Sequence, residues 1–433
     1  MITRIRERLA YYLFSPRLRR VRLVVLLAYS GGLFAALMLF KYHQGLLGWD
    51  FRAYYDASAR LLAGTSLYTS DLLSGGAMVF APGEYLYPPL LAQLVAPLSL
   101  LPFDAAFLLF TGASVILGSW SVLSAWRLGG GRMTARDALV LTGLLLFTVS
   151  LSEGLSLGNL YGPLMALVAL AISGRPLLSG LLGGMLKIAP GGVSLLALTM
   201  SSERKQRSLA IAGGVLLLSM IASPNAWGAY IGGAFEQTLR TSDPIGAGAN
   251  PAAIARLAGS VVDVRRGETG YVGAAEEAYR RSVMIMAPPW VSAVPTGLLV
   301  ALASAEGALR VAGWVLALWL IILAIRAAKD PRQRHVAVAL MTGGSLLIPW
   351  ALWDHYLLLL VPPAIVAWRV GARPARLRLL CGLIVTIIPV AAAMGRYNLA
   401  VLIALLLLLD GIRRTRLPES GAKTAAIAEG PLT

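Results

Sequence analysis

Two aspartates in the first polar segment of the chain differ in the charges around them. Asp56 has Arg52 four residues before it and Arg60 four residues after it, so on a helix it can form ion pairs with both. Asp50 has no arginine at that spacing and stands at the start of a predicted helix over residues 51–63. Its position leaves two interpretations open. Asp50 is either the N-cap of that helix or a general base that takes a proton from a hydroxyl group.

Two basic side chains at apolar segments are candidates for binding an anion. Lys187 lies inside an apolar segment that Pro190 interrupts. A lysine at the centre of a bilayer costs about 2.5–3.5 kcal/mol, so this position predicts a polar partner or a wet cavity. The alternative is a lysine whose ammonium reaches the membrane interface. His355 stands at the outer end of another apolar segment, and it either binds an anion or hydrogen-bonds to Asp354 or to the backbone.

The composition is that of an integral membrane protein. Of the 433 residues, 57% are hydrophobic and 14% are charged, and the mean hydropathy is +0.72. Soluble proteins contain about 25% charged residues. A soluble fold has too little interior for so much apolar surface, so we expect the bilayer to be part of the solvent.

Charge and cysteine content exclude other classes. The net charge of +17 comes from short basic runs beside apolar segments. Such runs are typical of cytoplasmic loops that face anionic lipid, and they do not predict a nucleic-acid partner. Cys381 is the single cysteine, so no disulfide can form within the chain, and three histidines offer little for a metal cluster. We therefore expect neither a metal nor a cofactor.

The apolar runs predict an all-α fold, a polytopic transmembrane bundle of about 12 spans. Residues 1–21 are predicted to be a basic cytoplasmic N-terminus, 22–412 the transmembrane domain, and 413–433 a disordered cytoplasmic tail. The candidate spans lie near residues 22–40, 88–101, 104–126, 138–152, 159–173, 177–200, 208–223, 307–326, 336–350, 355–369, 378–394 and 397–411.

The positive-inside rule orients these spans. Four basic connections, at 204–207, 326–334, 369–378 and 413–416, fall on one side, which we expect to be the cytoplasmic side of an inner (plasma) membrane, together with both termini. Two long outer loops, 41–87 and 225–290, have balanced charge and are expected to carry short helices. The arginine-rich segment 127–137 falls outside in this count, so either a span is misplaced between 88 and 175 or the rule is locally violated.

The order of several short motifs resembles glycosyltransferase family 87. The first loop contains Asp50 with Tyr54, Gly64 with Leu67-Tyr68, and Tyr87-Pro88-Pro89-Leu90. Gly180 to Pro190 is similar to the glycine-rich helix of the family that ends in Lys-x-x-Pro. Pro349-Trp350 and Trp353 to Tyr356 are similar to its tryptophan-rich segment with a histidine pair. The likeness covers most of residues 45–365.

The resemblance implies a fold and a reaction. It implies a GT-C-type catalytic domain over residues 22–412. This domain would move a hexose, mannose above others, from a polyprenyl phosphate to a glycolipid or glycan acceptor at the outer face. The reaction would invert the anomeric carbon and need no metal. In that family the loop aspartate is taken to be the catalytic base, a role that carries over to Asp50.

The same resemblance assigns the remaining site residues. For the donor phosphate it implies His355, Lys187 and Arg256, and for the substrates Tyr54, Tyr87, Trp49 and Asn250. The aromatic residues fit an interfacial belt equally well, and we favour the belt for Tyr55 and Tyr85. The sequence departs from the family pattern at Asp354, which stands where the first histidine is expected, and at Gly158-Asn159, where Gly-Gln-x-Asn is expected.

Two other functions remain open. An intramembrane lysine and broken helices also suit a secondary transporter or lipid flippase, although a transporter needs neither two long outer loops nor an unpaired carboxylate in one of them. A ligase of lipid-linked oligosaccharides would concentrate its chemistry in the loop 225–290. The sequence contains no P-loop, no Asp-x-Asp and no His-Glu-x-x-His, which argues against an ATP-driven pump, a metal-dependent nucleotide-sugar enzyme and a zinc enzyme.

Overall fold

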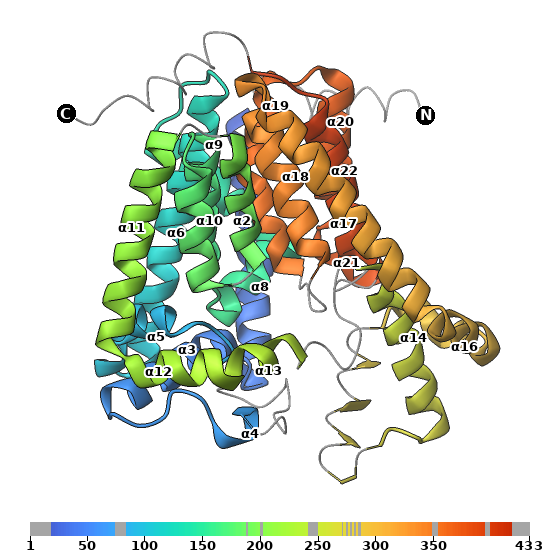
Figure 1. Ribbon diagram of the computed structural model, residues 1–433. Coiled ribbons are helices and arrows are strands. Elements are labelled where there is room, and N and C mark those ends of the chain that lie inside the picture. Colours follow the sequence, from blue (N-terminus) through green and yellow to red (C-terminus); the bar gives the residue numbers. More distant parts are fainter. Residues whose placement is uncertain are drawn as a thin grey trace, which may run out of the picture.

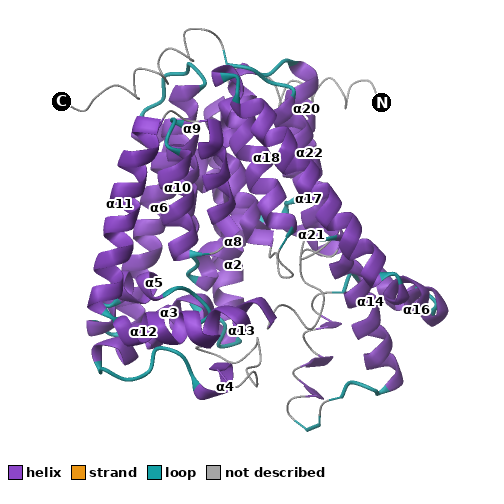
Figure 2. Cartoon of the chain, in the orientation of Figure 1, coloured by secondary structure: helices purple, strands orange, loops and turns teal. Residues whose placement is uncertain are grey.

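The computed structural model describes most of the chain as helix. It describes residues 19–73, 84–187, 189–199, 202–240, 250–270, 272–273, 276–277, 279–280, 283–284, 287–348, 354–394 and 399–417. Within these ranges the chain is helical, and the one β-type contact is an isolated bridge between Thr148 and Ile387 (Figure 2). The predicted all-α fold is thereby confirmed for the described residues.

The helices form an upright bundle with a layer of short, lying helices at one end (Figure 1). In chain order the elements are α2 (Arg19–His43), α3 (Trp49–Leu62), α4 (Ser70–Leu73), α5 (Pro89–Val95), η2 (Leu98–Leu100), α6 (Phe103–Leu128), α7 (Ala135–Leu144), η3 (Leu145–Phe147), α8 (Val149–Leu157), α9 (Tyr161–Ile172), α10 (Pro176–Leu186), η4 (Ala189–Thr199), α11 (Ser202–Ala222), α12 (Pro224–Ala229), the π-helical η5 (Tyr230–Ala234), α13 (Phe235–Arg240), α14 (Pro251–Arg266), η6 (Pro289–Ala293), α16 (Thr296–Ser304), α17 (Glu306–Ala328), η7 (Pro331–Gln333), α18 (Arg334–Leu347), η8 (Asp354–Leu360), α19 (Val361–Val370), α20 (Arg373–Val385), α21 (Ile388–Met394) and α22 (Leu399–Arg413).

Three of the described helices, α2, α6 and α17, are long and apolar enough to cross a membrane. The number rises to five if each of two bent pairs, α11 with α12 and α13, and α21 with α22, counts as one span. Shorter apolar helices, α9 and α10 among them, fill the space between these. The chain therefore has the helices of a membrane protein, whereas the predicted 12 spans are not reached by length and composition.

The predicted basic connections meet at one end of the bundle, the upper end in Figure 1. There Arg332 donates from Nε to the carbonyl of Leu417 at 3.1 Å, and Arg378 forms an ion pair with Asp410 at 2.6 Å. The helix α11 starts at the same end and runs down to α12 (Figure 1). The connections before α11, before α18, after α19 and after α22 therefore share one side, as the charge pattern predicts.

The segment 127–137 belongs to this same basic end. A Cβ added to Gly129 would lie 2.7 Å from Cβ of Arg369, and the Arg369 guanidinium stacks over the Trp126 ring at 4.7 Å. The segment therefore lies at the same end as the other basic connections, and its predicted place at the opposite end came from a misplaced span.

Two predicted spans are wrong, and their errors cancel. Residues 88–101 form α5, with 7 residues, and η2, with 3, which pack against α3 and are too short to span. In place of the predicted span 177–200, α10 and η4 form an antiparallel hairpin, in which Gly180 packs against Ser194 and Gly184 against Gly191. Removing one span and folding another back on itself leaves the later connections on the predicted side.

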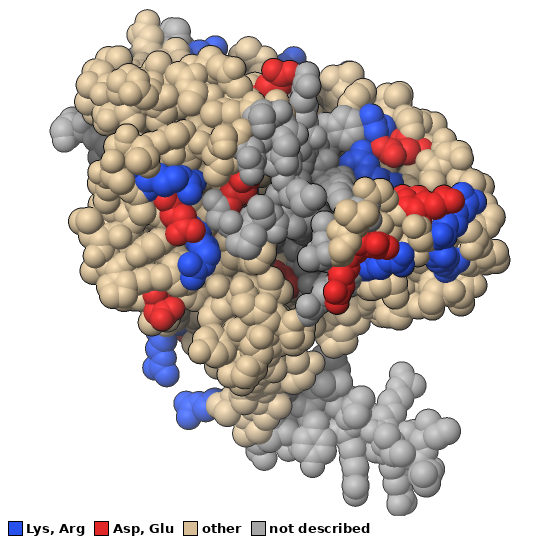
Figure 3. All heavy atoms as spheres, turned by 90° about the horizontal axis from the view of Figure 1, so that it is seen from below, with Lys and Arg blue, Asp and Glu red and all other residues tan. Residues whose placement is uncertain are grey.

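The lower end carries the predicted outer loops. The loop 41–87 contains α3 and α4, and the loop 225–290 contains α12, η5, α13 and α14, in agreement with the short helices expected there (Figure 1). Figure 3 looks onto this end and shows acidic and basic side chains interspersed. The mixed charge contrasts with the arginine-rich opposite end.

Candidate active site

The start of the first loop is held by α8 and the corner that follows it. The ammonium of Lys41, at the end of α2, forms an ion pair with Glu153 at 2.5 Å. The backbone N–H of Gly48 donates to the carbonyl of Ser156 at 2.8 Å. Both partners lie on α8, three residues apart, so they share one face of that helix.

A glycine at this corner lets α3 approach closely. Gly158 caps α8 with φ of 69°, a conformation that residues with a Cβ rarely adopt. A Cβ there would lie 2.6 Å from Cβ of Phe51 and 2.9 Å from Phe107 Cε2. Phe51 is fully buried and packs against Phe110 with ring centroids 4.9 Å apart. This packing fixes the first turn of α3 against the residue after Gly158.

That residue, Asn159, holds Asp50. Asn159 Nδ2 donates to Oδ2 of Asp50, and among the described residues no hydrogen bond reaches Oδ1. The N-cap of α3 is Gly48, which makes no side-chain cap bond, so the interpretation of Asp50 as the N-cap is wrong. Asp50 is instead an N-terminal residue of α3 with one carboxylate oxygen held and the other open.

Two opposing effects set the pKa of the Asp50 carboxyl. Asp50 as a whole residue is half-buried, and the burial of its carboxyl raises the pKa of that group. The positive charge of Lys187 and the hydrogen bond from Asn159 oppose the rise. A carboxylate in such an environment binds a proton more readily than an exposed aspartate does, as a general base must.

Lys187 reaches Asp50 from the other half of the bundle. The α-helix α10 ends at Leu186, and Lys187 adopts an extended conformation at the tip of the α10–η4 hairpin. Its ammonium is buried, donates to Asn159 Oδ1 at 3.2 Å, and lies 4.5 Å from the Tyr356 ring centroid and 5.2 Å from that of Tyr87. The predicted polar partner therefore exists, and the side chain does not reach for the membrane interface.

Tyrosines line the group formed by Asp50, Asn159 and Lys187, which we call the Asp50 cluster. The rings of Tyr54 and Tyr87 meet edge to face with centroids 5.1 Å apart. Burial raises the pKa of Tyr87 to about 12 and raises that of Tyr54 as well, so both hydroxyl groups stay protonated. Tyr85 is fully buried and donates to the Pro88 carbonyl at 2.6 Å, so its assignment to an interfacial belt is wrong. Trp49 precedes Asp50 on α3 and is partly buried, but none of the described contacts joins its side chain to Asp50 or Lys187.

Arg256 and Asn250 have other partners. Arg256 forms an ion pair with Glu306 at 2.8 Å. Asn250 is the N-cap of α14, where Oδ1 accepts from the Ala252 N–H at 2.9 Å and Nδ2 donates to the Leu347 carbonyl at 2.9 Å. Among the described contacts, neither residue touches the Asp50 cluster. The structure therefore separates these two candidates from the other site residues.

His355 cannot be compared in the same way, because its side chain lies outside the described residues. Its backbone belongs to η8, and the next residue is Tyr356, whose ring faces Lys187. The backbone of His355 therefore lies next to a residue that contacts Lys187.

The predicted ion pairs of Asp56 do not form in the described structure. Arg52 lies over the Phe103 ring at 4.0 Å from the centroid, and Arg60 donates to the Leu67 carbonyl at 3.0 Å. Both arginines still act on Asp56 through space, and burial raises the pKa of its carboxyl against them. Tertiary contacts have taken the arginines away from the pairing that helix spacing predicts.

Sequence reasoning missed the central role of Asn159 and the pairing of Lys41 with Glu153. The sequence did offer one signal for Asn159, because Gly158-Asn159 stands where the family pattern has Gly-Gln-x-Asn. Lys41 and Glu153 are far apart in the sequence, and only the packing of α2 on α8 brings them together.

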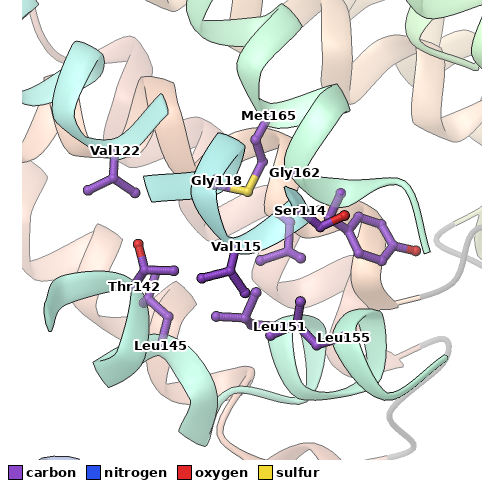
Figure 4. Close-up of a pocket in the computed structure, with 12 residues that line it drawn as sticks. Ser114, Val115, Gly118, Val122, Thr142, Leu145, Leu151, Leu155, Gly162 and Met165 are labelled. Carbon is purple, nitrogen blue, oxygen red and sulfur yellow. The ribbon is translucent and has the colours of Figure 1, made fainter. Parts of the chain in front are cut away.

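An apolar pocket lies between α6, α7, α8 and α9 (Figure 4). It has a volume of about 10 Å³, close to the least that holds one water molecule. Its lining is almost wholly apolar and includes Val115, Leu151, Leu155, Met165 and Tyr161. It is too small and too apolar to be a sugar site.

The comparisons with known proteins agree with the motif order. The family model described as Glycosyltransferase family 87 matches residues 85–362, which is more than half of the chain. The match includes Tyr87, Asn159, Lys187 and Tyr356 and begins after Asp50. No curated protein and no solved structure matches the chain.

Proposed function

Because the chain belongs to glycosyltransferase family 87, and is thus a membrane glycosyltransferase, we propose that its donor is a polyprenyl phosphate sugar. The sugar is a hexose, mannose above others, and the acceptor is a hydroxyl of a glycolipid or glycan. Transfer takes place at the outer face of the inner membrane, inverts the anomeric carbon and needs no metal. The termini and the basic end face the cytoplasm, and the bundle is of the GT-C type.

The observation that carries this proposal is the state of the Asp50 carboxylate. One oxygen is held by Asn159, no hydrogen bond from the described residues reaches the other, and α3, which carries Asp50, lies at the end of the bundle opposite the basic connections. A base that is oriented but not fully hydrogen-bonded can accept a proton from an incoming hydroxyl.

The reaction balances with one carboxylate. The acceptor oxygen attacks the anomeric carbon while the bond from that carbon to the phosphate oxygen breaks. Asp50 takes the proton of the acceptor, and polyprenyl phosphate leaves as an anion. The anion needs positive charge near the leaving oxygen, which Lys187 supplies, with His355 beside it.

The remaining predicted residues differ in how directly they act on the substrates in this proposal. Tyr54 and Tyr87 offer neutral hydroxyl groups to the sugars, and Trp49 offers an aromatic face at the mouth of the site. Arg256 must exchange its Glu306 partner before it can bind a phosphate. Asn250 supports the substrate site by anchoring α14 to α18 and not by touching the sugar.

Transport is the second candidate, favoured by one observation. Lys187 lies at the tip of a hairpin that enters the bundle and returns, and buried charges at broken helices are typical of secondary transporters. Uptake of a polyprenyl phosphate sugar into vesicles without transfer to an acceptor would support this function over the transferase.

The decisive experiment supplies purified protein with a panel of polyprenyl phosphate sugars and follows the release of polyprenyl phosphate. We expect turnover with one hexose donor and its loss in Asp50→Asn, which keeps the size and the hydrogen bond of the side chain. Asp56→Asn is the matched control, because Asp56 lies on the same helix with a carboxyl that is also partly buried. Full turnover in Asp50→Asn would remove Asp50 from the mechanism.

A further inference from the structure

We propose that Asn159 is a positioning residue of this transferase, which orients Asp50 and links it to the cation that meets the donor phosphate. This inference rests on the proposed function. It concerns a residue that contacts the base and the cation and does not itself exchange a proton or bond with the substrates.

The amide of Asn159 has only one orientation. Its Oδ1 accepts from the backbone N–H of Leu160 at 2.7 Å and from Lys187 Nζ at 3.2 Å. With both lone pairs of Oδ1 occupied by donors, the NH₂ group must point to Asp50. Asn159 is buried and follows the αL residue Gly158, so its backbone is fixed as well. The amide is therefore a rigid bridge between a cation and a carboxylate.

A bridge of this kind transmits charge. The ammonium of Lys187 draws electron density towards Oδ1, which makes the Nδ2 protons better donors to Asp50. Hydrogen bonds to a carboxylate stabilise its anion. A donor phosphate that binds Lys187 draws the ammonium away from Oδ1, and the amide then stabilises the Asp50 anion less. Asp50 becomes a stronger base after the donor has bound, when a base is needed.

Other groups near Asp50 leave this coupling measurable. Among the described residues, the charged side chains that face Asp50 are Lys187, Lys41 and Glu153, and the last two neutralise each other in an ion pair. The phenols of Tyr54 and Tyr87 also act on it, but burial raises the pKa of both, so they do not titrate below about pH 9. Among the described residues, a change caused by Asn159→Ala in the acidic range therefore reports on Asp50.

The test measures protonation of Asp50 without a sugar donor. Carbodiimide labels protonated carboxyls, so the labelling rate of Asp50, followed by mass spectrometry against pH in the full-length protein in detergent, gives its titration. We expect Asn159→Ala to move the midpoint up by about one pH unit, the equivalent of losing one hydrogen bond to a charged group. Asn225→Ala, at an exposed position on α12, is the control and leaves the midpoint unchanged.

Farnesyl phosphate then tests the link to Lys187. Adding it to the wild-type protein should raise the midpoint of Asp50, and the rise should be smaller in Asn159→Ala, where only the direct effects of the phosphate charge and of the displaced Lys187 charge remain. Equal shifts in the two proteins, or no shift in the wild type, would overturn the coupling.

Turnover separates this inference from the proposed function. With the donor found active in the panel, Asn159→Ala should lower kcat by about 100-fold, as for a misplaced catalytic group, and change the donor KM little. An active Asp50→Asn refutes the proposed function. An inactive Asp50→Asn together with a wild-type kcat and a wild-type Asp50 midpoint in Asn159→Ala refutes the role of Asn159 alone.

Discussion

Lys41 and Glu153 form a buried ion pair, 2.5 Å from Nζ to Oε2, that joins the end of α2 to α8. The two side chains are 7% and 1% exposed. Glu153 stands one helical turn before Ser156, which holds Gly48, and six residues before Asn159, which follows the end of α8 and holds Asp50. This buried ion pair therefore fixes the place where the first loop leaves the bundle.

Replacing only one residue of this ion pair should lower the stability of the protein more than replacing both. Lys41→Met leaves the Glu153 carboxylate buried without its cation, and we expect a loss of about 3–5 kcal/mol of stability. The double variant Lys41→Met with Glu153→Leu removes both charges and should recover most of that loss. Thermal unfolding in detergent, followed by tryptophan fluorescence, measures both. Equal losses in the single and the double variant would show that the pair is not a coupled unit.

Gly158→Ala should separate steric contact from backbone strain. The added Cβ meets Phe51 and Phe107 and also forces an unfavourable φ, so we expect α3 to shift and turnover to fall by at least about 100-fold. Gly64→Ala is the matched control, because its φ of 67° is similar and nothing lies within 4 Å of its Cβ. That variant should lose only about 1 kcal/mol of stability and keep its turnover. Similar activity of the two variants would contradict the proposed docking of α3.

The helical fold and the basic end followed from the sequence because both depend on local composition. Apolar runs predict helices, and arginine runs predict a side, without knowledge of packing. Two spans were misplaced because hydropathy does not distinguish a spanning helix from a buried short one. Pro88 and Pro97 bound α5 in the first case, and Pro190 and the small residues Gly180 and Gly184 allow a hairpin in the second.

The grouping of the candidate site residues could also be predicted only in part, because some of their contacts depend on packing. Asp50, Lys187 and Tyr87 come together as the motif order indicates, although they lie on three separate elements. Asn159 was not chosen because its role depends on Gly158 and on the packing of Phe51. Arg256 was chosen for its charge, which Glu306 takes up in the folded chain.

Lys187 and Arg256 should differ in their effect on the donor phosphate. Lys187 lies at the Asp50 cluster, whereas Arg256 is paired elsewhere. We expect Lys187→Met to weaken binding of farnesyl phosphate by at least about tenfold, since a hydrogen bond to a charged group contributes about 1.5–3 kcal/mol. Arg256→Met should change it less than threefold. Isothermal titration of the purified variants measures both affinities, and the opposite order would place the phosphate near α14.

The side of the segment 127–137 can be tested with thiol reagents. In a Cys381→Ala background, Arg132→Cys and Thr65→Cys place single thiols at exposed positions on the two ends of the protein. We expect a membrane-impermeant maleimide to label Thr65→Cys in intact cells and Arg132→Cys only after the membrane is opened. Labelling of Arg132→Cys in intact cells would return this segment to the outer side.

The pH dependence of turnover should report the buried state of Asp50. Burial raises the pKa of its carboxyl, and a general base works only as the anion, so the rate should fall as the pH drops through a value above the ordinary aspartate pKa of about 4.

The same shift means that ionised Asp50 lowers the stability of the folded protein at neutral pH, because the folded state binds the proton more tightly than the unfolded state. Asp50→Asn removes that cost, so it should unfold at the wild-type temperature or above while losing turnover. A variant that is both inactive and clearly less stable at neutral pH would show that Asp50 serves the fold and not the reaction.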